Sequence, residues 1–566
     1  MTDSPDRPAA HKFVLRPGAP SLPGVRLDAR WRVPVYMGRR LPKALAPYAA
    51  SVFSWEWMIQ DVLNGRMPPP VVARERPPLR EYQHEPVKLI QNAHASQAPG
   101  FLLAYPTGSG KTAMCICATH DLPDVRRVLV VTKLDVVPAW RRAISYFGSG
   151  GKRWVVINPE QLWRLFFHPL RPLNSLPVDK AAEFAAQGGI LHFPFDVVIV
   201  DESHMLASPA SLRSRTVQRL LLPEHGTNRR PWFLRASASP FSNPGETAYL
   251  DDLLAHAAGV DAPGALSRAG YQEWLSSLGF TLNTDHTRRW FHDLNGDDVN
   301  KLNHLLFSRG VGTTATAEEL GLPSMTRELR PVELSPDDQV QYESAWSEFR
   351  AQYGLEAVDD VLDSTSEALR RVQKASLLKA PKVAQIVAGL VEEGYQVVVP
   401  AWYLDSVSAI ARLTAAALKA RGLPDRVVEI TGADRHLRER KRQLFQAGHA
   451  LVAVTNSLEG VNFHAGERGG AGNGRDATQS PRACVIADVL TGGRRILQAE
   501  GRTHRDGQRS QTVYVFAENT LEEEWLARVL RAAAGTQALV QSPRDAQDLM
   551  DLAAQLTGAV DGRPGQ

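Results

Sequence analysis

The segment Pro106-Thr-Gly-Ser-Gly-Lys-Thr112 contains the residue types of a phosphate-binding loop. It lies between an apolar run that predicts a buried strand and a segment with the composition of a buried helix. Glycines let backbone N–H groups close on anionic oxygens, and the helix N-terminus adds a favourable partial charge. We predict that Lys111 contacts the β- and γ-phosphates of a nucleotide and that Thr112 holds Mg²⁺. The other nucleotide-binding residues predicted in this loop are Thr107, Gly108, Ser109 and Gly110.

One position of this loop departs from the usual G-x-x-x-x-G-K-[ST] pattern, because Tyr105 stands where the first glycine is expected. The ring either stacks near the nucleotide or packs under the loop. We expect it to pack under the loop.

A pair of carboxylates, Asp201 and Glu202, follows directly on the predicted strand Phe195–Val200. Carboxylates at the carboxyl end of a strand, facing a phosphate loop, suit phosphoryl chemistry. We expect Asp201 to complete the Mg²⁺ shell through water, and Glu202 to orient or deprotonate the attacking water. Small hydroxyl residues, Ser237 and Ser239, end a further predicted strand, where they could couple the nucleotide site to moving parts.

Two arginines near the C-terminus, Arg502 and Arg505, are three residues apart and would share one face of a helical turn. If they come from a second folded unit, both guanidinium groups can reach a γ-phosphate held by the first unit. An arginine finger of this kind is worth about 10³ to 10⁵ in rate. The predicted nucleotide site is therefore shared between two units, and its hydrolysis cycle would drive their relative motion.

Two blocks of alternating strand and helix patterns position these residues. Such alternation predicts parallel sheets covered on both faces, with ligands at the carboxyl ends of the strands. The predicted strands of the first block are Phe101–Ala104, Arg127–Thr132, Arg153–Asn158, Phe195–Val200 and Trp232–Ser237. Those of the second block are Gln396–Pro400, Arg426–Ile430, Ala450–Thr455, Ala483–Ala487 and Thr512–Phe516.

The predicted boundaries follow changes in these patterns. Between the two α/β blocks the strand signals vanish and helical periodicity dominates. We predict an N-terminal accessory domain (1–75), a first α/β block (76–245), a helical insertion and linker (246–380), a second α/β block (381–535), and a C-terminal helix and tail (536–566).

Composition places the chain among ordinary globular proteins. Its 566 residues carry a formal net charge of +4, which permits a nucleic-acid partner without arguing for one. No apolar run approaches the length of a membrane span, and the N-terminus lacks the apolar core of a secretion signal. Three cysteines form neither a disulfide framework nor a metal site by spacing, so we expect a reducing cytosol. The abundance of alanine and arginine favours a bacterial or phage-infected cell, with a nuclear location as the alternative.

Taken together, the motifs resemble those of superfamily-two helicases and translocases, in the Swi/Snf-like branch. The matching segments are Leu79–Gln83, Pro106–Thr112, the DExH-type Asp201–His204, Ser237–Ser239, Thr455–Phe463 and Gln498–Gln508. The match runs from about residue 76 to 530 with motif order intact, and departs by carrying Ser203 where alanine or glycine is more frequent. The resemblance implies two RecA-like domains in tandem and ATP with Mg²⁺ as cofactors.

The resemblance also implies roles for individual residues. Gln83 would read the adenine, Gln498 would orient water, Arg505 would be the arginine finger, and Arg502 a second contact to the γ-phosphate. Coupling between nucleotide and motion is expected at His204, Ser237, Ser239 and Gly460. The resemblance also implies contacts to the nucleic-acid phosphate backbone from Thr132, Lys133, Asn158, Thr455 and Asn456. Such contacts position a protein without reading sequence.

Other candidate nucleic-acid contacts have plainer readings. The basic run Arg435–Arg442 could lie along a duplex, but basic runs are more often solvated helix faces. Trp140 and Trp402 could stack on bases, although packing at a helix start and a strand end is the expected role.

The leading hypothesis is an ATP-driven motor that moves along double-stranded DNA, with protein partners that the sequence does not identify. A strand-separating DNA or RNA helicase, and the motor subunit of a restriction or defence complex, are the alternatives within the enzyme class. A nucleotide-gated DNA-binding scaffold is the alternative outside it. That scaffold would be expected to lack a catalytic group, whereas Lys111, both carboxylates and both arginines are present.

Overall fold

A computed structural model gives the fold of the chain. It describes residues 11–15, 20–27, 34–38, 41–48, 78–134, 136–167, 173, 176–191, 194–221, 230–241, 244–263, 268–281, 283–284, 289–290, 296–316, 319–321, 325–353, 366–401, 403–432, 437–456, 462–467, 471, 475–488, 493–504, 510–540 and 543–561. Of the predicted site residues, Arg505 and Gly460 lie outside these ranges, as does Trp402.

The first sheet has six parallel strands in the order β13-β4-β10-β9-β5-β6. Their bounds are β4 Gly100–Ala104, β5 Arg127–Val131, β6 Arg153–Ile157, β9 Val197–Asp201, β10 Trp232–Ser237 and β13 Gly312–Thr314. The five strands predicted for the first block are therefore confirmed. Every residue of β4, β9 and β10 is buried, as expected for strands covered by helices on both faces.

The helices and short strands around this sheet come from the connections between its strands. The helices are α2 Glu81–Ala95, α3 Lys111–His120, α4 Val137–Phe147, α5 Val178–Gly188, α6 Leu212–Gln218, α7 Asp251–Ala258, α8 Arg268–Ser277 and α9 Gly296–Asn303. Two small ribbons pair β7 Phe166–Phe167 with β8 Ile190–Leu191, and β11 Asn283–Thr284 with β12 Arg289–Trp290.

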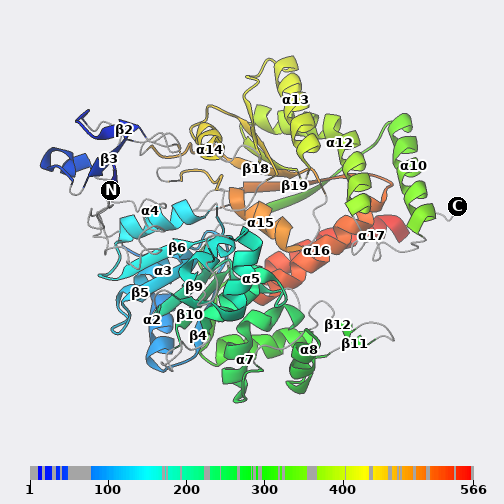
Figure 1. Cartoon of the computed structure of the whole chain (residues 1–566). Helices are drawn as coiled ribbons and strands as arrows, with labels where there is room; N and C mark the ends of the chain where they lie inside the picture. Colours follow the sequence, from blue (N-terminus) through cyan, green and yellow to red (C-terminus); the bar gives the residue numbers. More distant parts are fainter. Residues whose placement is uncertain are drawn as a thin grey trace.

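The second sheet also has six parallel strands, in the order β14-β19-β18-β15-β17-β16. Their bounds are β14 Thr326–Val332, β15 Gln396–Pro400, β16 Val427–Ile430, β17 Val452–Thr455, β18 Arg482–Ile486 and β19 Ser510–Ala517. The five strands predicted for the second block are confirmed. With two parallel six-stranded sheets in tandem, the α/β fold class with two RecA-like units is confirmed as well (Figure 1).

Side chains alternate between the two faces of the second sheet, so each face has its own core. Val397 and Val485 lie in one cluster with residues of α12 Ser366–Glu392 and α13 Leu404–Ala420. Cys484 and Tyr514 lie in another cluster with α15 Gly493–Thr503, α16 Leu521–Val540 and α17 Pro543–Asp561. A smaller cluster forms under α14 Arg438–Gln446.

The prediction that residues 246–380 are helical without strands is wrong, because β11, β12, β13 and β14 all lie in this segment. Strand β13 of this segment pairs with β4 at the edge of the first sheet, and β14 pairs with β19 at the edge of the second. The rest includes helices α7 to α9 and α10 Pro336–Tyr353. Strand β13 is three residues long, and β14 is mostly half-buried or exposed, so neither carries the continuous apolar run of an inner parallel strand.

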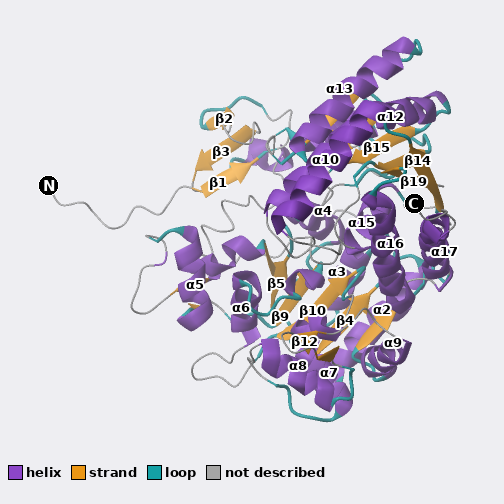
Figure 2. Cartoon of the chain, turned by 90° about the vertical axis from the view of Figure 1, so that its right-hand side faces the viewer, coloured by secondary structure: helices purple, strands orange, loops and turns teal. Residues whose placement is uncertain are grey.

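The described N-terminal residues form a small antiparallel sheet that stands apart from the two large ones (Figure 2). Its strands are β1 His11–Val14, β2 Val25–Leu27 and β3 Pro34–Gly38. In the part of the chain that the structure describes, no helix combines the length and apolarity that crossing a membrane requires.

Candidate nucleotide site between the two units

The register of the first sheet brings the predicted catalytic segments to one edge. Ala104 pairs with Ser237, and Ala236 pairs with Asp201, so strands β4, β10 and β9 end at the same level. Strand β10 lies between the strand before the phosphate loop and the strand that ends in the carboxylate pair. Ser237 therefore sits between the two halves of the predicted site.

The phosphate loop has the backbone shape that its glycines require. Gly108 and Gly110 have φ of 90° and 83°, in the left-handed region that side chains disfavour. Helix α3 begins at Lys111. The Lys111 Nζ donates to the carbonyl oxygens of Tyr105 and Pro106 at 2.8 and 3.0 Å. The Ser109 hydroxyl is buried and has no hydrogen-bond partner among the described residues, as expected of a group that a phosphate oxygen would satisfy.

Gln83 lies directly against the phosphate loop. Its Nε2 donates to the Ser109 carbonyl at 2.8 Å, and its Oε1 accepts from the Arg80 backbone N–H at 3.0 Å. A Cβ built on Gly110 would lie 2.3 Å from that Nε2, and the positive φ of Gly110 also disfavours a side chain there. The predicted adenine-reading residue thus also fixes the loop, and whether it reads adenine stays a prediction.

Tyr105 is 5% exposed and belongs to the core of the first unit. Burial raises the pKa of its hydroxyl, and a hydrogen bond with Thr313 of β13 opposes that shift. The expected packing of this ring under the loop is confirmed. The large residue fits because the short edge strand β13 covers it.

Asp201 ends β9 and is held by three donors. Its Oδ2 accepts from Trp140 Nε1 at 2.6 Å and from Thr132 Oγ1 at 3.1 Å, while Oδ1 accepts from the Glu202 backbone N–H at 3.1 Å. Burial and the neighbouring Glu202 charge raise the pKa of Asp201, and the Trp140 hydrogen bond acts in the opposite direction. The spacing of the sequence gave no signal for the Trp140 bond, because 61 residues separate the partners.

Glu202 has φ of 53°, one of the few positive values at a residue other than glycine. Burial alone would raise its pKa, but the electrostatic attraction of His204, Lys111 and Arg502 outweighs burial and lowers the pKa to about 2. The carboxylate is therefore ionised throughout the physiological pH range. It is placed to attract and orient a polar reactant, and it is a weak proton acceptor for this reason.

His204 joins the carboxylate pair to both the neighbouring strand and the second unit. Its Nδ1 lies 3.0 Å from Ser237 Oγ and 3.4 Å from Glu202 Oε2. Its Nε2 lies 3.2 Å from Gln498 Nε2, the donor end of that amide. The backbone N–H of Ser239 donates to Ser237 Oγ at 3.1 Å. Five of the predicted residues, Glu202, His204, Ser237, Ser239 and Gln498, thus form one connected chain across the two units.

Helix α15 brings the second unit against the phosphate loop. A Cβ built on Gly501 would lie 2.8 Å from the Thr107 Cβ, so the Thr107 side chain occupies the space that a side chain at position 501 would need. Arg502 is 8% exposed, its charge acts on Glu202, and its carbonyl accepts from the Phe463 backbone N–H at 2.9 Å. Gln498 and Arg502 therefore face the site that Lys111 and the carboxylates form.

We expect Gly501→Val to hold the two units apart and to lower ATP turnover by at least tenfold, because its side chain would overlap Thr107. Gly535→Val is the matched control, since it also places valine in a helix but has open space around the new Cβ. Steady-state phosphate release measures both variants. Equal turnover in both would contradict the close contact between α15 and the phosphate loop.

Two polar networks support the helix and the segment before it. Glu500 of α15 is 1% exposed and accepts from Arg327 Nε of β14 at 2.9 Å and from the Tyr514 hydroxyl. Arg327 also binds Asp545 of α17 at 3.0 Å. The edge strand, β19 and the last helix are therefore all tied to the helix that carries Gln498 and Arg502.

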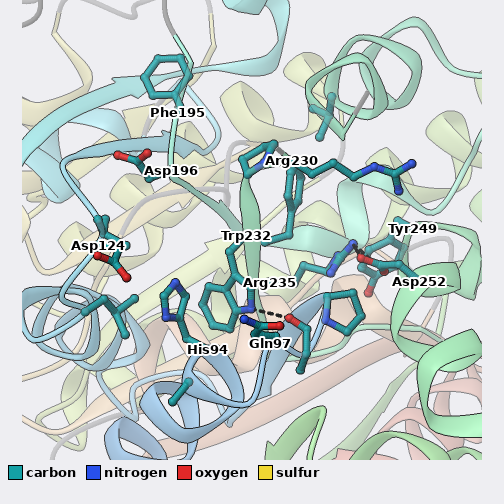
Figure 3. A pocket seen from close by; sticks show the side chains of 18 of the residues that line it. His94, Gln97, Asp124, Phe195, Asp196, Arg230, Trp232, Arg235, Tyr249 and Asp252 are labelled. Atoms are coloured by element: carbon teal, nitrogen blue, oxygen red, sulfur yellow. Dashed lines mark hydrogen bonds and ion pairs between the residues drawn. The ribbon is translucent and has the colours of Figure 1, made fainter. Parts of the chain in front are cut away.

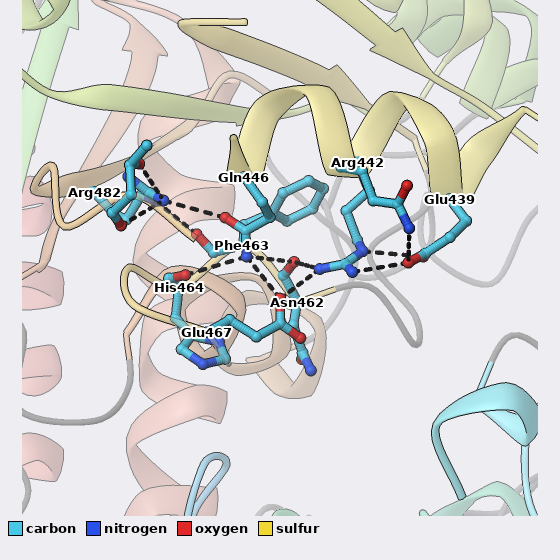
Figure 4. Close-up of polar contacts among 10 residues, drawn as sticks. Glu439, Arg442, Gln446, Asn462, Phe463, His464, Glu467 and Arg482 are labelled. Atoms are coloured by element: carbon cyan, nitrogen blue, oxygen red, sulfur yellow. Dashed lines mark hydrogen bonds and ion pairs between the residues drawn. The ribbon is translucent and has the colours of Figure 1, made fainter. Parts of the chain in front are cut away.

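The second network holds residues 462–467 in place (Figure 4). This segment contacts α15, because the Phe463 backbone N–H donates to the Arg502 carbonyl. The fully buried Arg482 donates Nε to the Phe463 carbonyl at 2.8 Å and Nη2 to Gln446 Oε1 at 3.1 Å. Gln446 in turn donates to Glu467 at 2.8 Å, and Glu467 also binds Arg442. No sequence pattern indicates this network, since its members come from α14, β18 and a loop.

The structure places three of the five predicted nucleic-acid contacts inside the protein. Thr132, Asn158 and Thr455 are at most 2% exposed, and the Thr132 hydroxyl donates a hydrogen bond to Asp201. Lys133 and Asn456 are half-buried, and Asn456 Oδ1 accepts from the Gly432 backbone N–H at 3.3 Å. Contact of these five residues with nucleic acid remains a prediction.

The basic run near α14 is partly structural. Arg442 is buried, and it makes a bidentate pair with Glu439 at 2.9 and 3.0 Å. Arg438 is also buried, whereas Arg440 is exposed. The run is therefore neither a uniformly solvated face nor a continuous basic surface.

The oxygen donors of the site fit Mg²⁺. Thr112 in the first turn of α3 and Asp201 at the end of β9 are hard oxygen donors, and no group of three or more His, Cys, Asp or Glu side chains gathers as a metal cage in the described parts of the chain. Mg²⁺ usually keeps its waters and binds one or two protein oxygens together with substrate phosphates. Bound there, it would neutralise charge on the phosphates.

A large cavity of about 1210 Å³ lies away from this site (Figure 3). It opens at the amino ends of β4, β9 and β10, between α2, α6 and the start of α7. Trp232 and the Arg235–Asp252 ion pair line it. Because catalytic loops follow the carboxyl ends of parallel strands, this cavity lies at the opposite end of the strands from the predicted nucleotide site.

Part of the chain matches a known protein family, and the chain has similar solved structures. Residues 76–221 match the family described as "Type III restriction enzyme, res subunit". Among solved structures, the chain is similar to the SWI2/SNF2 ATPase core of Sulfolobus solfataricus in complex with dsDNA, at 13% identity, over 86% of this chain and 98% of that chain, with a TM-score of 0.32. Comparison with the curated proteins finds no match.

The family match covers residues 76–221, and together with the two parallel sheets it supports a helicase-type ATP-dependent nucleic-acid motor. The predicted resemblance to superfamily-two helicases and translocases is confirmed.

Proposed function

We propose that the protein hydrolyses ATP in the cleft between its two α/β units and uses the cycle to move along double-stranded DNA. The observation that carries the proposal is the hydrogen bond between Gln498 and His204, which joins the second unit to the carboxylate motif of the first. A nucleotide bound by Lys111 and Thr112 would be contacted from both sides. Opening and closing of this cleft converts the state of the nucleotide into domain motion.

The proposed roles follow the geometry. Lys111 and the loop N–H groups bind the phosphates, Glu202 orients the attacking water, and Arg502 offers positive charge from the second unit. Electrostatic positioning of this type is the main catalytic contribution in phosphoryl transfer. Arg505, as the arginine finger, is part of the proposal on the strength of its sequence position.

We expect ATP turnover to rise at least tenfold with duplex DNA, and less with single-stranded DNA or RNA. Phosphate release measured with each nucleic acid tests this directly, and Lys111→Ala is the background control because it removes the phosphate-binding cation. A triplex-displacement assay then detects movement without strand separation. Stimulation by RNA alone, or efficient unwinding of a blunt duplex without triplex displacement, would favour a strand-separating helicase. Absence of turnover with any nucleic acid, with ATP binding retained, would favour a scaffold.

A further inference from the structure

The buried indole of Trp140 makes a short polar contact that packing alone does not require. Trp140 is fully buried in α4, and its Nε1 donates to Asp201 Oδ2 at 2.6 Å. Thr132, also fully buried and located at the end of β5, donates its hydroxyl to the same oxygen at 3.1 Å. Two side chains from different elements thus converge on one oxygen of the carboxylate.

The other oxygen of Asp201 is held differently. Among the residues that the structure describes, the Oδ1 atom accepts only the backbone N–H of its neighbour Glu202, at 3.1 Å. Two side-chain donors on one oxygen restrict the orientation of the carboxylate group. The other oxygen can then face a ligand. Partners of this kind, one step behind a metal ligand, orient it and tune its affinity for the metal.

We propose that Trp140 and Thr132 are positioning residues for Asp201, which fix Oδ2 and present Oδ1 toward Mg²⁺–ATP. This inference deepens the proposed function and rests on it. It assigns Thr132 to the carboxylate rather than to the nucleic-acid backbone, and it gives Trp140 a role beyond filling the core.

The test is the Mg²⁺ dependence of binding of a fluorescent ATP analogue, measured without turnover. In Trp140→Phe, which keeps an aromatic ring but removes the N–H, the Mg²⁺ concentration for half-maximal binding should rise about 10- to 100-fold. Binding of the analogue without Mg²⁺ should equal that of the wild type, because the phosphate loop is unchanged.

Trp154→Phe is a matched control in the same unit. Trp154 is also fully buried, and its Nε1 donates at 3.0 Å to the Ser149 backbone carbonyl rather than to a carboxylate. Both variants lose one buried indole hydrogen bond, so they should lose similar stability, while only Trp140→Phe should change the Mg²⁺ dependence. Equal Mg²⁺ shifts in the two variants, or none in Trp140→Phe, would overturn the inference.

Thr132→Val provides a second variant that keeps the shape of the side chain and tests the other donor. It should raise the Mg²⁺ requirement and leave affinity for duplex DNA, measured without nucleotide, within twofold of the wild type. A loss of DNA affinity with an unchanged Mg²⁺ requirement would mean that Thr132 contacts nucleic acid, and it would overturn the role proposed for this residue. A wild-type protein that shows no Mg²⁺-dependent nucleotide binding would overturn the proposed function, and the inference with it.

Discussion

Glu202→Gln should lower ATP turnover by about 10²- to 10⁴-fold while nucleotide binding is retained. The substitution keeps the size of the side chain and removes a charge that His204, Lys111 and Arg502 stabilise, with a pKa of about 2. An amide orients water less strongly than this carboxylate does and accepts no proton. Binding should survive, because the loop from Thr107 to Thr112 supplies the phosphate contacts.

Phosphate release and titration with a fluorescent ATP analogue measure the two expectations separately. Glu160→Gln is a suitable control, since Glu160 forms an exposed ion pair with Arg213 in the same unit. Turnover by Glu202→Gln at the wild-type rate would remove the role assigned to this carboxylate. Loss of binding together with turnover would instead mean that the carboxylate maintains the shape of the site.

Glu500→Ala should lower the free energy of unfolding of the second unit by about 3–5 kcal/mol, because the buried Arg327 loses its bidentate carboxylate and keeps the partly exposed Asp545 as its other partner. Arg327 is 3% exposed and Glu500 1% exposed, so water cannot replace the lost carboxylate. The Tyr514 hydroxyl loses its acceptor as well. Denaturant unfolding, followed by a signal from the second unit, measures the change.

The exposed pair of Arg421 and Glu392 offers the control, and Glu392→Ala should cost no more than about 1 kcal/mol. Replacing both buried partners, as Arg327→Met with Glu500→Leu, should recover much of the loss, because neither charge is then stranded. If Glu500→Ala were as mild as Glu392→Ala, the network would not be what holds α15 to the sheet.

Sequence patterns were sufficient for the inner strands and for the loops that follow them. Buried parallel strands such as Val197–Asp201 are short apolar runs, and the polar residues after them are conspicuous. The edge strands β13 and β14 were missed because an edge strand needs fewer apolar residues. Their place in the sheets is decided by pairing with β4 and β19, which no local pattern records.

Contacts between residues far apart in the sequence were the second feature that sequence patterns did not predict. Glu202, His204 and Ser237 were each predicted because each belongs to a short motif, although their mutual contacts were not. Trp140 was interpreted only as packing, since an indole at a helix start gives no sign that its N–H meets a carboxylate 61 residues away. The Arg482–Gln446 network is hidden for the same reason, because its partners are 36 residues apart.

The two edge strands have a consequence for how the chain is built. All strands of the first sheet end by Thr314 and all strands of the second begin at Thr326 or later, so each sheet is encoded by one continuous stretch. Only eleven residues separate these strands, which limits their separation to about 40 Å when the chain is fully extended. During synthesis the first sheet can be completed before any strand of the second emerges. The first unit would then be a folded template against which α15 later docks.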